Sequence, residues 1–515
     1  MSNLKITIGS RGSKLALWQA NHIKEKLSHY GLESEIKIIK TKGDQIQHLS
    51  FDKIEGKGFF TKELEIALID EEIDLAVHSL KDMETNQSNE LLIAAVPQRE
   101  NPCDTLLINY SSVDKSQDLN IIKKGKIGTS SARRKNQLLL FREDLIIKDL
   151  RGNVPTRIQK LRDGNYDAII LAKAGINRLN IDISDFHLID LSPMMFIPAP
   201  AQGALGIQIK NSSHKLKKIL TKLSHKETLD NVVFERKILN GIGGGCHSPM
   251  GAFSKIDKNG IRRTWVSYSE KVDKTPTRFL TYSNDISAIV RKVKNKTKNK
   301  NVWISRKLHK ESIFSKLLTN KGHNVTGQSL IEKEVIKINQ LPKCDWIFFN
   351  SIFSFDSIKS LKNKFLSKKI AAFGKSTANY LTKNGLNVDF VGKGSPLETA
   401  NGFKKILNNT EIVFFPSSNR TIGTVQSLLD EKNKIVLSTY NTSLIEASIK
   451  SHDFYVFTSP SNVEAFFKIN QLKDNKVISI GPSTTKKLKD FGVKDVEEAF
   501  ESTELALVDM VFSLI

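Results

Sequence analysis

Short runs of β-branched and apolar residues alternate with stretches of helical periodicity along most of this chain. This alternation restricts the fold to the α/β class, because each strand is followed by a helix that can cover a sheet. The run LKITIGS at 4–10 predicts a strand, and apolar residues three or four apart at 14–30 predict the helix that follows. The alternation repeats to about residue 210, which predicts two α/β domains.

A Pro-rich segment at 192–209 interrupts the alternation and suits a chain that crosses back between those two domains. Residues 213–290 begin with a helical stretch at 215–239 and continue into weaker strands, which predicts a small α+β domain. The basic stretch at 291–301 lacks apolar periodicity, so we expect a linker there rather than a nucleic-acid-binding arm. A fresh series of strands and helices then predicts a separate α/β unit from 302 to 515.

The 515 residues predict three or four domains, and 39% apolar with 26% charged residues exclude a disordered or fibrous chain. No stretch approaches the roughly 20 apolar residues that span a bilayer, and no export signal begins the sequence, so we expect a soluble cytoplasmic protein. Cys103, Cys246 and Cys344 are too few and too scattered for a disulfide framework or a CxxC metal site. We expect free thiols and no bound metal.

The formal charge is +23, from 78 basic and 55 acidic residues, and it is spread over the whole chain. Such an excess suits nucleic acid, an anionic membrane or small polyanionic substrates. Much of it is lysine in a Lys/Asn/Ile-rich composition, so a coding bias explains the bulk charge equally well.

Polar residues gather at the ends of predicted strands, where α/β sheets usually bind ligands. VHSLKD at 77–82 ends one strand with His78, Ser79, Lys81 and Asp82, although a solvated loop would have the same composition. GTSSARR and LRGNVPTR put hydroxyls and arginines at two strand-to-helix turns, where the helix dipole attracts anions. Because guanidinium binds carboxylate in a bidentate way, these two turns predict a carboxylate-binding cleft. Six arginines occupy predicted strand ends or helix starts: Arg11, Arg133, Arg134, Arg151, Arg157 and Arg178.

GGGCHSP at 243–249 sets Cys246 in a glycine-rich turn, an exposed position unlike that of an inert buried thiol. The residues alone leave open whether Cys246 is a covalent attachment point or nucleophile, or an ordinary cysteine. His247 is adjacent in sequence, which does not show that it activates the thiol.

Nine motifs, in order and spacing, resemble the porphobilinogen deaminase family over residues 4–253. They are GSRGSKLALWQA, KGDQ, GKGFFTKELEIAL, DLAVHSLKD, GTSSARR, LRGNVPTR, YDAIILAKAGINRL, PAPAQGALGI and GGGCHSPMGAF. The resemblance implies an enzyme that joins four porphobilinogens into hydroxymethylbilane with release of ammonia. It also implies two periplasmic-binding-protein-like α/β domains, 1–98 with 199–212 and 99–198, and an α+β domain at 213–290 that carries the cofactor cysteine.

By the same resemblance, Cys246 carries a dipyrromethane cofactor through a thioether. Asp82, with Lys81 beside it, handles the proton on the departing amino group and stabilises the pyrrole cation, and Met83 follows where a proline often sits. Each pyrrole brings an acetate and a propionate, so basic and hydroxyl groups are implied at several positions. The implied cofactor-binding residues are Ser79, Lys81, Asp82, Thr129, Ser130, Ser131, Arg133, Arg134 and Arg151. The implied substrate-binding residues are Arg11, Ser13, Lys53, Phe60, Arg151, Arg157, Arg178 and Gln202.

Residues 302–515 resemble uroporphyrinogen-III synthase in the segments VLSTYNT, VFTSPSNVEAFF and ISIGPSTTKKLKDFG. The resemblance implies a two-domain α/β unit, 302–336 with 443–515 and 337–442, that closes hydroxymethylbilane with inversion of its last pyrrole. Tyr440 would assist loss of the terminal hydroxyl. The residues that would hold carboxylates at helix starts are Ser459, Ser461, Thr484 and Thr485.

We therefore expect a bifunctional enzyme of heme biosynthesis, a transferase and a lyase in one monomeric chain. Its partners would be small polyanionic substrates, porphobilinogen and hydroxymethylbilane, without nucleic acid or membrane. One alternative is a deaminase with a non-catalytic α/β domain at its C-terminal end. The other is an anion- or nucleic-acid-binding protein, since solute-binding proteins also pair two α/β domains, although Cys246 has no place in it.

Overall fold

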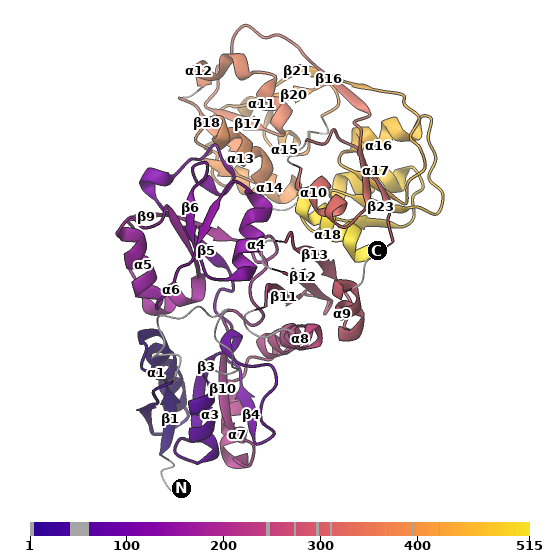
Figure 1. Cartoon of the computed structure of the whole chain (residues 1–515). Coiled ribbons are helices and arrows are strands. Elements are labelled where there is room, and N and C mark those ends of the chain that lie inside the picture. The colour runs from indigo at the N-terminus through magenta and orange to yellow at the C-terminus, as the bar shows by residue number, and fades with distance from the viewer. Residues whose placement is uncertain are drawn as a thin grey trace. The chain divides into compact units, whose positions relative to one another are not determined.

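A computed structural model describes residues 5–41, 61–243, 248–271, 274–294, 298–309, 312–365, 367–392, 396–421 and 423–515. The chain divides into two units, Met1–Val113 with Ile121–Thr297 and Asp114–Asn120 with Lys298–Ile515 (Figure 1). Both units mix helices and strands, which confirms the α/β class expected from the alternation.

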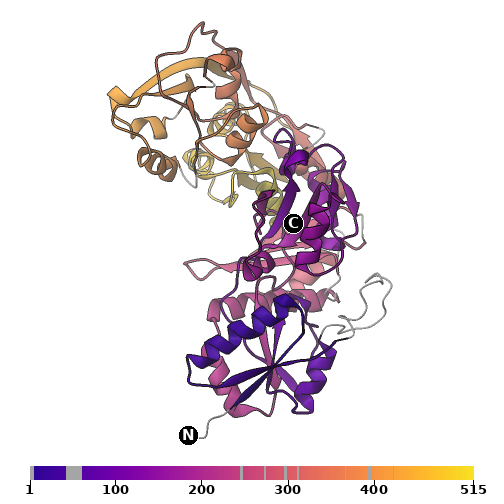
Figure 2. The same ribbon diagram turned by 90° about the vertical axis from the view of Figure 1, so that its left-hand side faces the viewer.

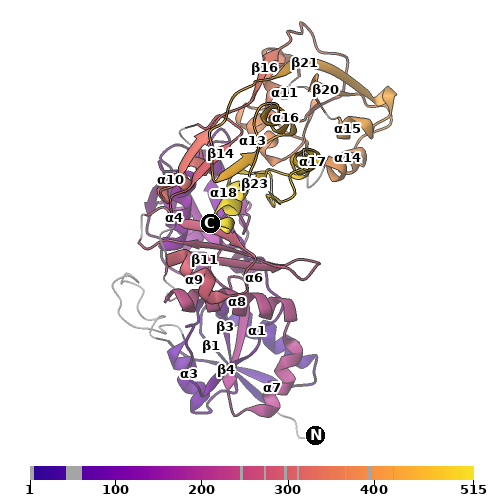
Figure 3. The same ribbon diagram turned by 90° about the vertical axis from the view of Figure 1, so that its right-hand side faces the viewer.

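The first sheet combines N-terminal strands with one strand that returns much later in the chain. Its order is β2 (Ser34–Ile38), β1 (Ile6–Ser10), β3 (Leu75–Ser79), β10 (Leu205–Lys210) and β4 (Leu91–Ala95). Strands β1, β2 and β3 are parallel, and β10 is antiparallel to both of its neighbours. Helices α1 (Lys14–Ser28) and α7 (His214–Leu220) pack on one face and α3 (Lys62–Ile69) on the other (Figures 2 and 3).

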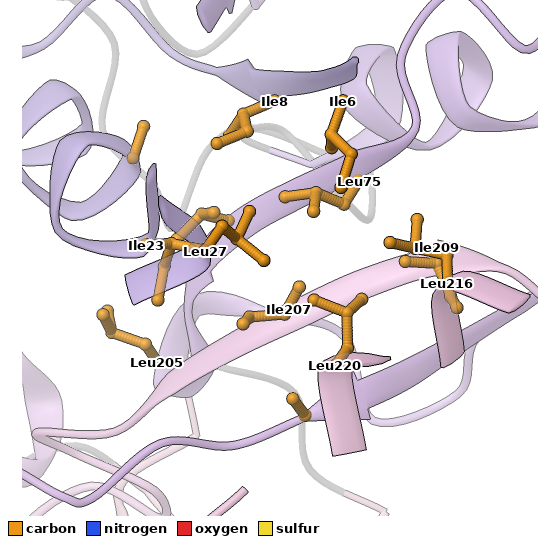
Figure 4. Close-up of a cluster of buried hydrophobic side chains, with 13 residues drawn as sticks. Ile6, Ile8, Ile23, Leu27, Leu75, Leu205, Ile207, Ile209, Leu216 and Leu220 are labelled. Atoms are coloured by element: carbon orange, nitrogen blue, oxygen red, sulfur yellow. The ribbon is translucent and has the colours of Figure 1, made fainter. Parts of the chain in front are cut away.

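Figure 4 shows the core between this sheet and its helices α1 and α7. Ile6 and Ile8 are alternate residues of β1, so both point to the same face as Ile207 of β10. Ile23 and Leu27, four apart on α1, lie opposite them and are fully buried. The apolar side chains whose spacing predicted the strand and the helix therefore pack together in one core.

The second sheet repeats the order of the first with other strands. These are β7 (Ile146–Lys148), β6 (Lys126–Gly128), β8 (Ala168–Ala172), β5 (Asp104–Asn109) and β9 (Phe186–Leu191). Helices α4 (Ala132–Phe141), α5 (Val154–Arg162) and α6 (Lys173–Leu179) follow β6, β7 and β8. The chain crosses from the first sheet before β5 and returns to it through the Pro-rich segment before β10. The turns singled out in the sequence thus follow the parallel strands of both sheets.

Antiparallel strands β11 (Met250–Ile256), β12 (Arg262–Tyr268) and β13 (Thr277–Thr281) form a third sheet, which packs on α8 (Lys226–Ile242). The helical stretch expected at 215–239 is broken, because His225 has an extended backbone and its ring nitrogen caps α8. Helix α9 (Ile286–Lys294) lies beside α8 and takes in the first four residues of the expected linker, since Val293 is buried (Figure 3). Within that stretch, the described residues without regular structure are 298–300.

The second unit contains two further sheets, each with its own buried apolar cluster. One is all parallel, in the order β15 (Asn324–Gly327), β14 (Asn301–Ile304), β22 (Phe454–Phe457), β23 (Lys476–Ser479) and β24 (Val496–Glu498). The other runs β16 (Ile331–Val335), β21 (Lys434–Leu444), β20 (Val413–Ser418), β17 (Trp346–Phe349), β18 (Lys369–Ala372) and β19 (Phe390–Val391). In it only β16 is antiparallel to its neighbour.

Helices of the second unit follow the strands in alternation. The helices that alternate with strands of the all-parallel sheet are α10 (Ile313–Asn320), α16 (Pro460–Phe467), α17 (Pro482–Asp490) and α18 (Glu504–Leu514). The helices that alternate with strands of the other sheet are α11 (Ile352–Asp356), α12 (Lys362–Phe365), α13 (Lys375–Lys383), α14 (Pro396–Lys404) and α15 (Thr424–Ser427). The chain passes between these sheets twice, before β16 and after β21.

Candidate functional site

Strand β3 passes directly into a 3₁₀ turn, Leu80–Asp82, which carries the polar end of VHSLKD. Asp82 is exposed, and Lys81 beside it is half-buried. Burial lowers the pKa of the Lys81 ammonium to about 8, although the Asp82 carboxylate opposes this shift. The positive charges of Arg134 and Arg133 lower the pKa of Lys81 further. Both arginines belong to the first turn of α4, which follows β6 of the second sheet, so the 3₁₀ turn lies near the start of that helix.

The other two polar residues of this motif, His78 and Ser79, form hydrogen bonds with neighbouring elements of the first sheet and its helix α1. His78 is buried with its Nε2 3.0 Å from Gln208 Oε1, and burial lowers its pKa to about 4. Ser79 Oγ accepts a hydrogen bond of 2.8 Å from Gln19 Nε2. His78 is therefore neutral and held within the sheet, and the charged groups at this strand end are Lys81 and Asp82.

The hydroxyl residues after β6 build the turn into α4. Ser131 caps the helix, because its Oγ accepts from the backbone N–H of Arg134 at 3.5 Å. Ser130 Oγ exchanges two 3.0 Å bonds with the backbone of Leu150, and Thr129 Oγ1 accepts from Ser131 N–H at 3.2 Å. The turn is rich in serine and threonine because their short side chains can form hydrogen bonds with the nearby backbone. Ser130 is nevertheless exposed to solvent.

Arg133 and Arg134 share Asp104, a residue that the sequence did not single out. Asp104 starts β5 and is fully buried, with Oδ2 2.8 Å from Arg133 Nη1 and Oδ1 2.7 Å from Arg134 Nη2. Gln202 Nε2 donates to the same Oδ1 at 3.1 Å. Burial alone would raise the pKa of Asp104, but the two guanidinium groups outweigh it and hold that pKa well below its usual range.

Arg157 joins this charge cluster from α5. Its Nε donates to Gly152 O at 2.7 Å, and burial lowers its pKa to about 10, with Arg134 and Arg151 adding repulsion and Asp82 opposing it. The cluster thus holds five cations and two carboxylates, a formal excess of 5 − 2 = +3. Its members are Lys81, Arg133, Arg134, Arg151, Arg157, Asp82 and Asp104. We refer to it as the cationic cluster, and its excess suits a ligand with several carboxylates.

Arg178 links the second sheet to helix α1 of the first. Its Nη2 donates to Gly203 O at 2.6 Å, and its guanidinium carbon lies 5.8 Å from the centre of the Trp18 ring. Burial lowers the pKa of Arg178 to about 10, so it stays charged at neutral pH. Ser13 caps α1, and Arg11 follows β1 close enough for its charge to lower the pKa of the histidine in β3.

Three predicted site residues, Lys53, Phe60 and Cys246, lie outside the described residues. The two described cysteines are not activated. Cys103 is half-buried with its pKa raised by burial to about 11, and burial also raises the pKa of Cys344.

In the second unit, Tyr440 lies in β21 with its ring buried and edge-on against Phe353, at 4.9 Å between ring centres. Lys333 Nζ lies 5.8 Å from the centre of the Tyr440 ring. Tyr440 pairs with Ser418, the last residue of β20, and with Val335 of β16. It therefore stands at the carboxyl end of β20, the edge at which α/β sheets usually bind ligands.

The predicted hydroxyl residues of this unit belong to the other, all-parallel sheet. Ser459 follows β22 and caps α16 by accepting from Asn462 N–H at 3.3 Å. Thr485 follows β23, with its Oγ1 2.5 Å from both Ser479 Oγ and Glu498 Oε2. Because β22 and β23 are parallel neighbours, these helix starts share one edge of the sheet.

Two further hydroxyl residues at this edge, Ser305 and Thr458, were missed by sequence reasoning. Ser305 follows β14 and Thr458 follows β22, and Ser305 Oγ accepts from the N–H of Thr458 at 2.8 Å. Of the other predicted residues, Thr484 is buried and Ser461 is half-buried. A hydroxyl immediately after a predicted strand was the available signal, and Ser305 carries it in NVWISR.

Within the described ranges, no helix is both long enough and apolar enough to cross a membrane.

Two family models match this chain in succession. Residues 6–218 match porphobilinogen deaminase, dipyromethane cofactor binding domain, and residues 311–509 match uroporphyrinogen-III synthase HemD. The chain is 45% identical over 266 residues to porphobilinogen deaminase of Clostridium novyi (strain NT), which covers 51% of this chain and 87% of the relative. It is 44% identical over 263 residues to porphobilinogen deaminase of Maridesulfovibrio salexigens, covering 50% and 83%. Uroporphyrinogen-III synthetase from Helicobacter pylori 26695 aligns with a TM-score of 0.33 at 17% identity, covering 42% of this chain and 100% of that one.

Proposed function

Because the chain belongs to the porphobilinogen deaminase family and carries a uroporphyrinogen-III synthase domain at 311–509, we propose that it performs two consecutive steps of heme biosynthesis. The first half joins four porphobilinogens into hydroxymethylbilane and releases ammonia. The second half closes hydroxymethylbilane to uroporphyrinogen III with inversion of the last pyrrole. The observation that carries the first assignment is the exposed Asp82 carboxylate within the cationic cluster, whose excess charge is +3.

The donor set of this cluster fits a dipyrromethane cofactor. Two pyrrole units bring four carboxylates, and the cluster has five cationic groups, two of which are paired with the buried Asp104. We assign Cys246 as the thioether attachment point, together with the hydroxyls of Thr129, Ser130 and Ser131 as neighbours of the cofactor. When bound, the dipyrromethane supplies the pyrrole carbon on which the chain is extended.

Asp82 is the group that moves the proton in this assignment. A carboxyl group can give a proton to the departing amino group, which then leaves as ammonia, and can take up the proton that the attacked pyrrole carbon loses when the new C–C bond forms. The negative charge of the carboxylate stabilises the positive charge that develops on the pyrrole. Lys81, with a pKa of about 8, is mostly protonated at neutral pH and binds a substrate carboxylate. Arg11, Ser13 and Arg178 are assigned to binding further carboxylates of the substrate.

In the second half, Tyr440 is assigned to the loss of the terminal hydroxyl of hydroxymethylbilane. The starts of α16 and α17, with Ser459, Ser461, Thr484 and Thr485, are assigned to its carboxylates, because helix N-termini offer backbone N–H groups to anions. The parallel arrangement of β22 and β23 supports this, since it brings both helix starts to one sheet edge.

Intact mass and product analysis of the full-length chain test the proposal together. From cells that make porphobilinogen, the purified chain should carry the added mass of two linked pyrroles, and porphobilinogen should yield ammonia and the type III isomer. Cys246→Ser should lose both the adduct and the activity, whereas Cys103→Ser and Cys344→Ser should keep them. A bare polypeptide mass would contradict the first assignment. Only type I product would favour a deaminase with a non-catalytic C-terminal domain.

A further inference from the structure

One arginine holds the backbone of the turn that carries the proposed proton-transfer group. Arg236 of α8 is buried, and its Nη1 donates to the carbonyl oxygens of Leu80 at 2.8 Å and Met83 at 3.1 Å. Its Nη2 donates to Glu84 O at 2.6 Å. Three carbonyls of residues 80–84, here called the catalytic turn, therefore share one planar guanidinium group.

The apolar side chains of the catalytic turn are fixed from the same helix and from the sheet. Leu80 and Met83 are buried in one cluster with Val232, which lies one helical turn before Arg236 on α8. On the sheet side, a Cβ added at Gly206 of β10 would lie 2.8 Å from Leu80 Cδ1. Both inner side chains are thus closely packed, while Asp82 between them is exposed.

A third contact continues along the same face of α8. Asn240, one turn after Arg236, accepts from Thr85 Oγ1 at 3.2 Å through its Oδ1. Residues four apart lie on one side of a helix, so Val232, Arg236 and Asn240 form a single stripe against the catalytic turn. The last residue of α8 precedes Cys246 by only four positions in the sequence.

We infer that Arg236 is a positioning residue of the deaminase reaction, which acts on turnover by fixing the direction of the Asp82 carboxylate. The inference rests on the proposed role of Asp82. A guanidinium presents several N–H groups in a rigid plane, so three carbonyls bound to it keep fixed mutual orientations. A lysine at this position keeps the charge but offers a single nitrogen, which leaves the peptide planes of the turn free to rotate.

Arg236→Lys in the full-length chain tests this through kinetics. The variant should keep the covalent cofactor by intact mass, lower kcat by at least about tenfold and leave KM for porphobilinogen within about threefold. The discriminating measurement is a double-mutant cycle with Asp82→Asn. If Arg236 acts through Asp82, the double variant should turn over no more slowly than Asp82→Asn alone. Losses that multiply would overturn the inference.

Arg278→Lys is the matched control. Arg278 is also buried, and it donates to the carbonyls of Met194 and Met195, both at 2.8 Å and both outside the catalytic turn. Its variant should be less stable with kcat within about twofold of wild type. An equal loss of kcat in both lysine variants would make the effect of Arg236 a general one and would overturn the inference.

The outcomes separate this inference from the proposed function. Normal turnover of Arg236→Lys overturns the positioning role and leaves Asp82 untouched, whereas normal turnover of Asp82→Asn overturns the role of Asp82 itself. If Arg236→Lys does not fold, Thr85→Val removes the outer contact to Asn240 instead. It should lower kcat by about threefold in the wild-type background and have no effect in Asp82→Asn. No loss, or an equal loss in both backgrounds, would overturn the inference.

Discussion

Arg133 and Arg157 both belong to the cationic cluster, but they differ in what their removal leaves behind. Arg133→Leu takes one of two cations from the fully buried Asp104 and should lower the free energy of unfolding by about 3–5 kcal/mol. Arg157 makes no ion pair with the residues that the structure describes, so Arg157→Leu should change stability by less than about 1 kcal/mol. It should instead stall chain growth, since a desolvated substrate carboxylate loses about 2–5 kcal/mol of binding.

Urea unfolding and intact mass of the elongation intermediates distinguish these effects. Equal destabilisation by the two substitutions would mean that Arg157 is structural. Normal elongation in Arg157→Leu would mean that its charge is only surface charge.

Lys81 should make the deaminase sensitive to alkaline pH. Its pKa of about 8 lies below the ordinary 10.5, so the ammonium is lost as pH rises through 8. We expect kcat/KM for porphobilinogen to decline there, and Lys81→Arg to shift the decline upward because arginine stays protonated. An unchanged pH profile in Lys81→Arg would assign the decline to another group. For folding, the unfolded chain binds the extra proton between about pH 8 and 10.5, so this group adds stability as pH rises through that window.

Residue-scale chemistry was predictable where its signal was local. Ser131 and Ser13 precede helices and cap them, and Asp82 lies in the 3₁₀ turn that follows its strand. Asp104 was missed because its partner Arg133 lies 29 residues away. Arg236 was missed because its bond to the catalytic turn spans 156 residues. Contacts that exist only after folding left no pattern in the sequence.

Helix α9 determines where the first unit ends. Ile289 and Val293 are buried four residues apart, and α9 packs on α8. A chain cut after residue 290 should be less stable than one cut after 297 by about 1–2 kcal/mol, the burial of one valine-sized side chain. Urea unfolding of the two truncated chains measures this difference. Equal midpoints would mean that the last turn of α9 adds nothing.

Elements with strong periodicity, such as β1 and α1, were predicted to within two residues. The break before α8 was not, because it depends on a histidine cap, and histidine is not among the usual cap residues. Strand order was also beyond the sequence pattern. Strand β10 enters between β3 and β4, so Leu205 pairs with Ser79 although all strands of the second sheet lie between them in the sequence. Periodicity reports which face of an element is buried and does not report its neighbour.

At the scale of the whole molecule, separate apolar cores predict that fragments 1–297 and 298–515 fold independently, with the short segment Asp114–Asn120 of the second unit left in the first fragment. The cut should leave Asn301 with the second unit, because Asn301 starts β14 and its N–H donates to Asp453 Oδ2 at 2.8 Å. Residues 1–297 should yield only hydroxymethylbilane, which closes without enzyme to the type I isomer. Residues 298–515 should convert hydroxymethylbilane to type III.

Tyr440→Phe in the full-length chain then asks whether the two activities can be separated at one atom. The substitution keeps the buried ring against Phe353 and removes only the hydroxyl, so the fold and the consumption of porphobilinogen should be unchanged. Without the group assigned to loss of the terminal hydroxyl, more hydroxymethylbilane should escape and close unaided, and the product should shift from type III toward type I. Tyr380→Phe is the matched control, because that hydroxyl is already bonded to Asp356 Oδ1 at 2.9 Å in the same unit. Its isomer ratio should stay that of wild type. An unchanged ratio in Tyr440→Phe, with an active 298–515 fragment, would reduce Tyr440 to a packing role and leave ring closure to the hydroxyls and helix starts of the parallel sheet.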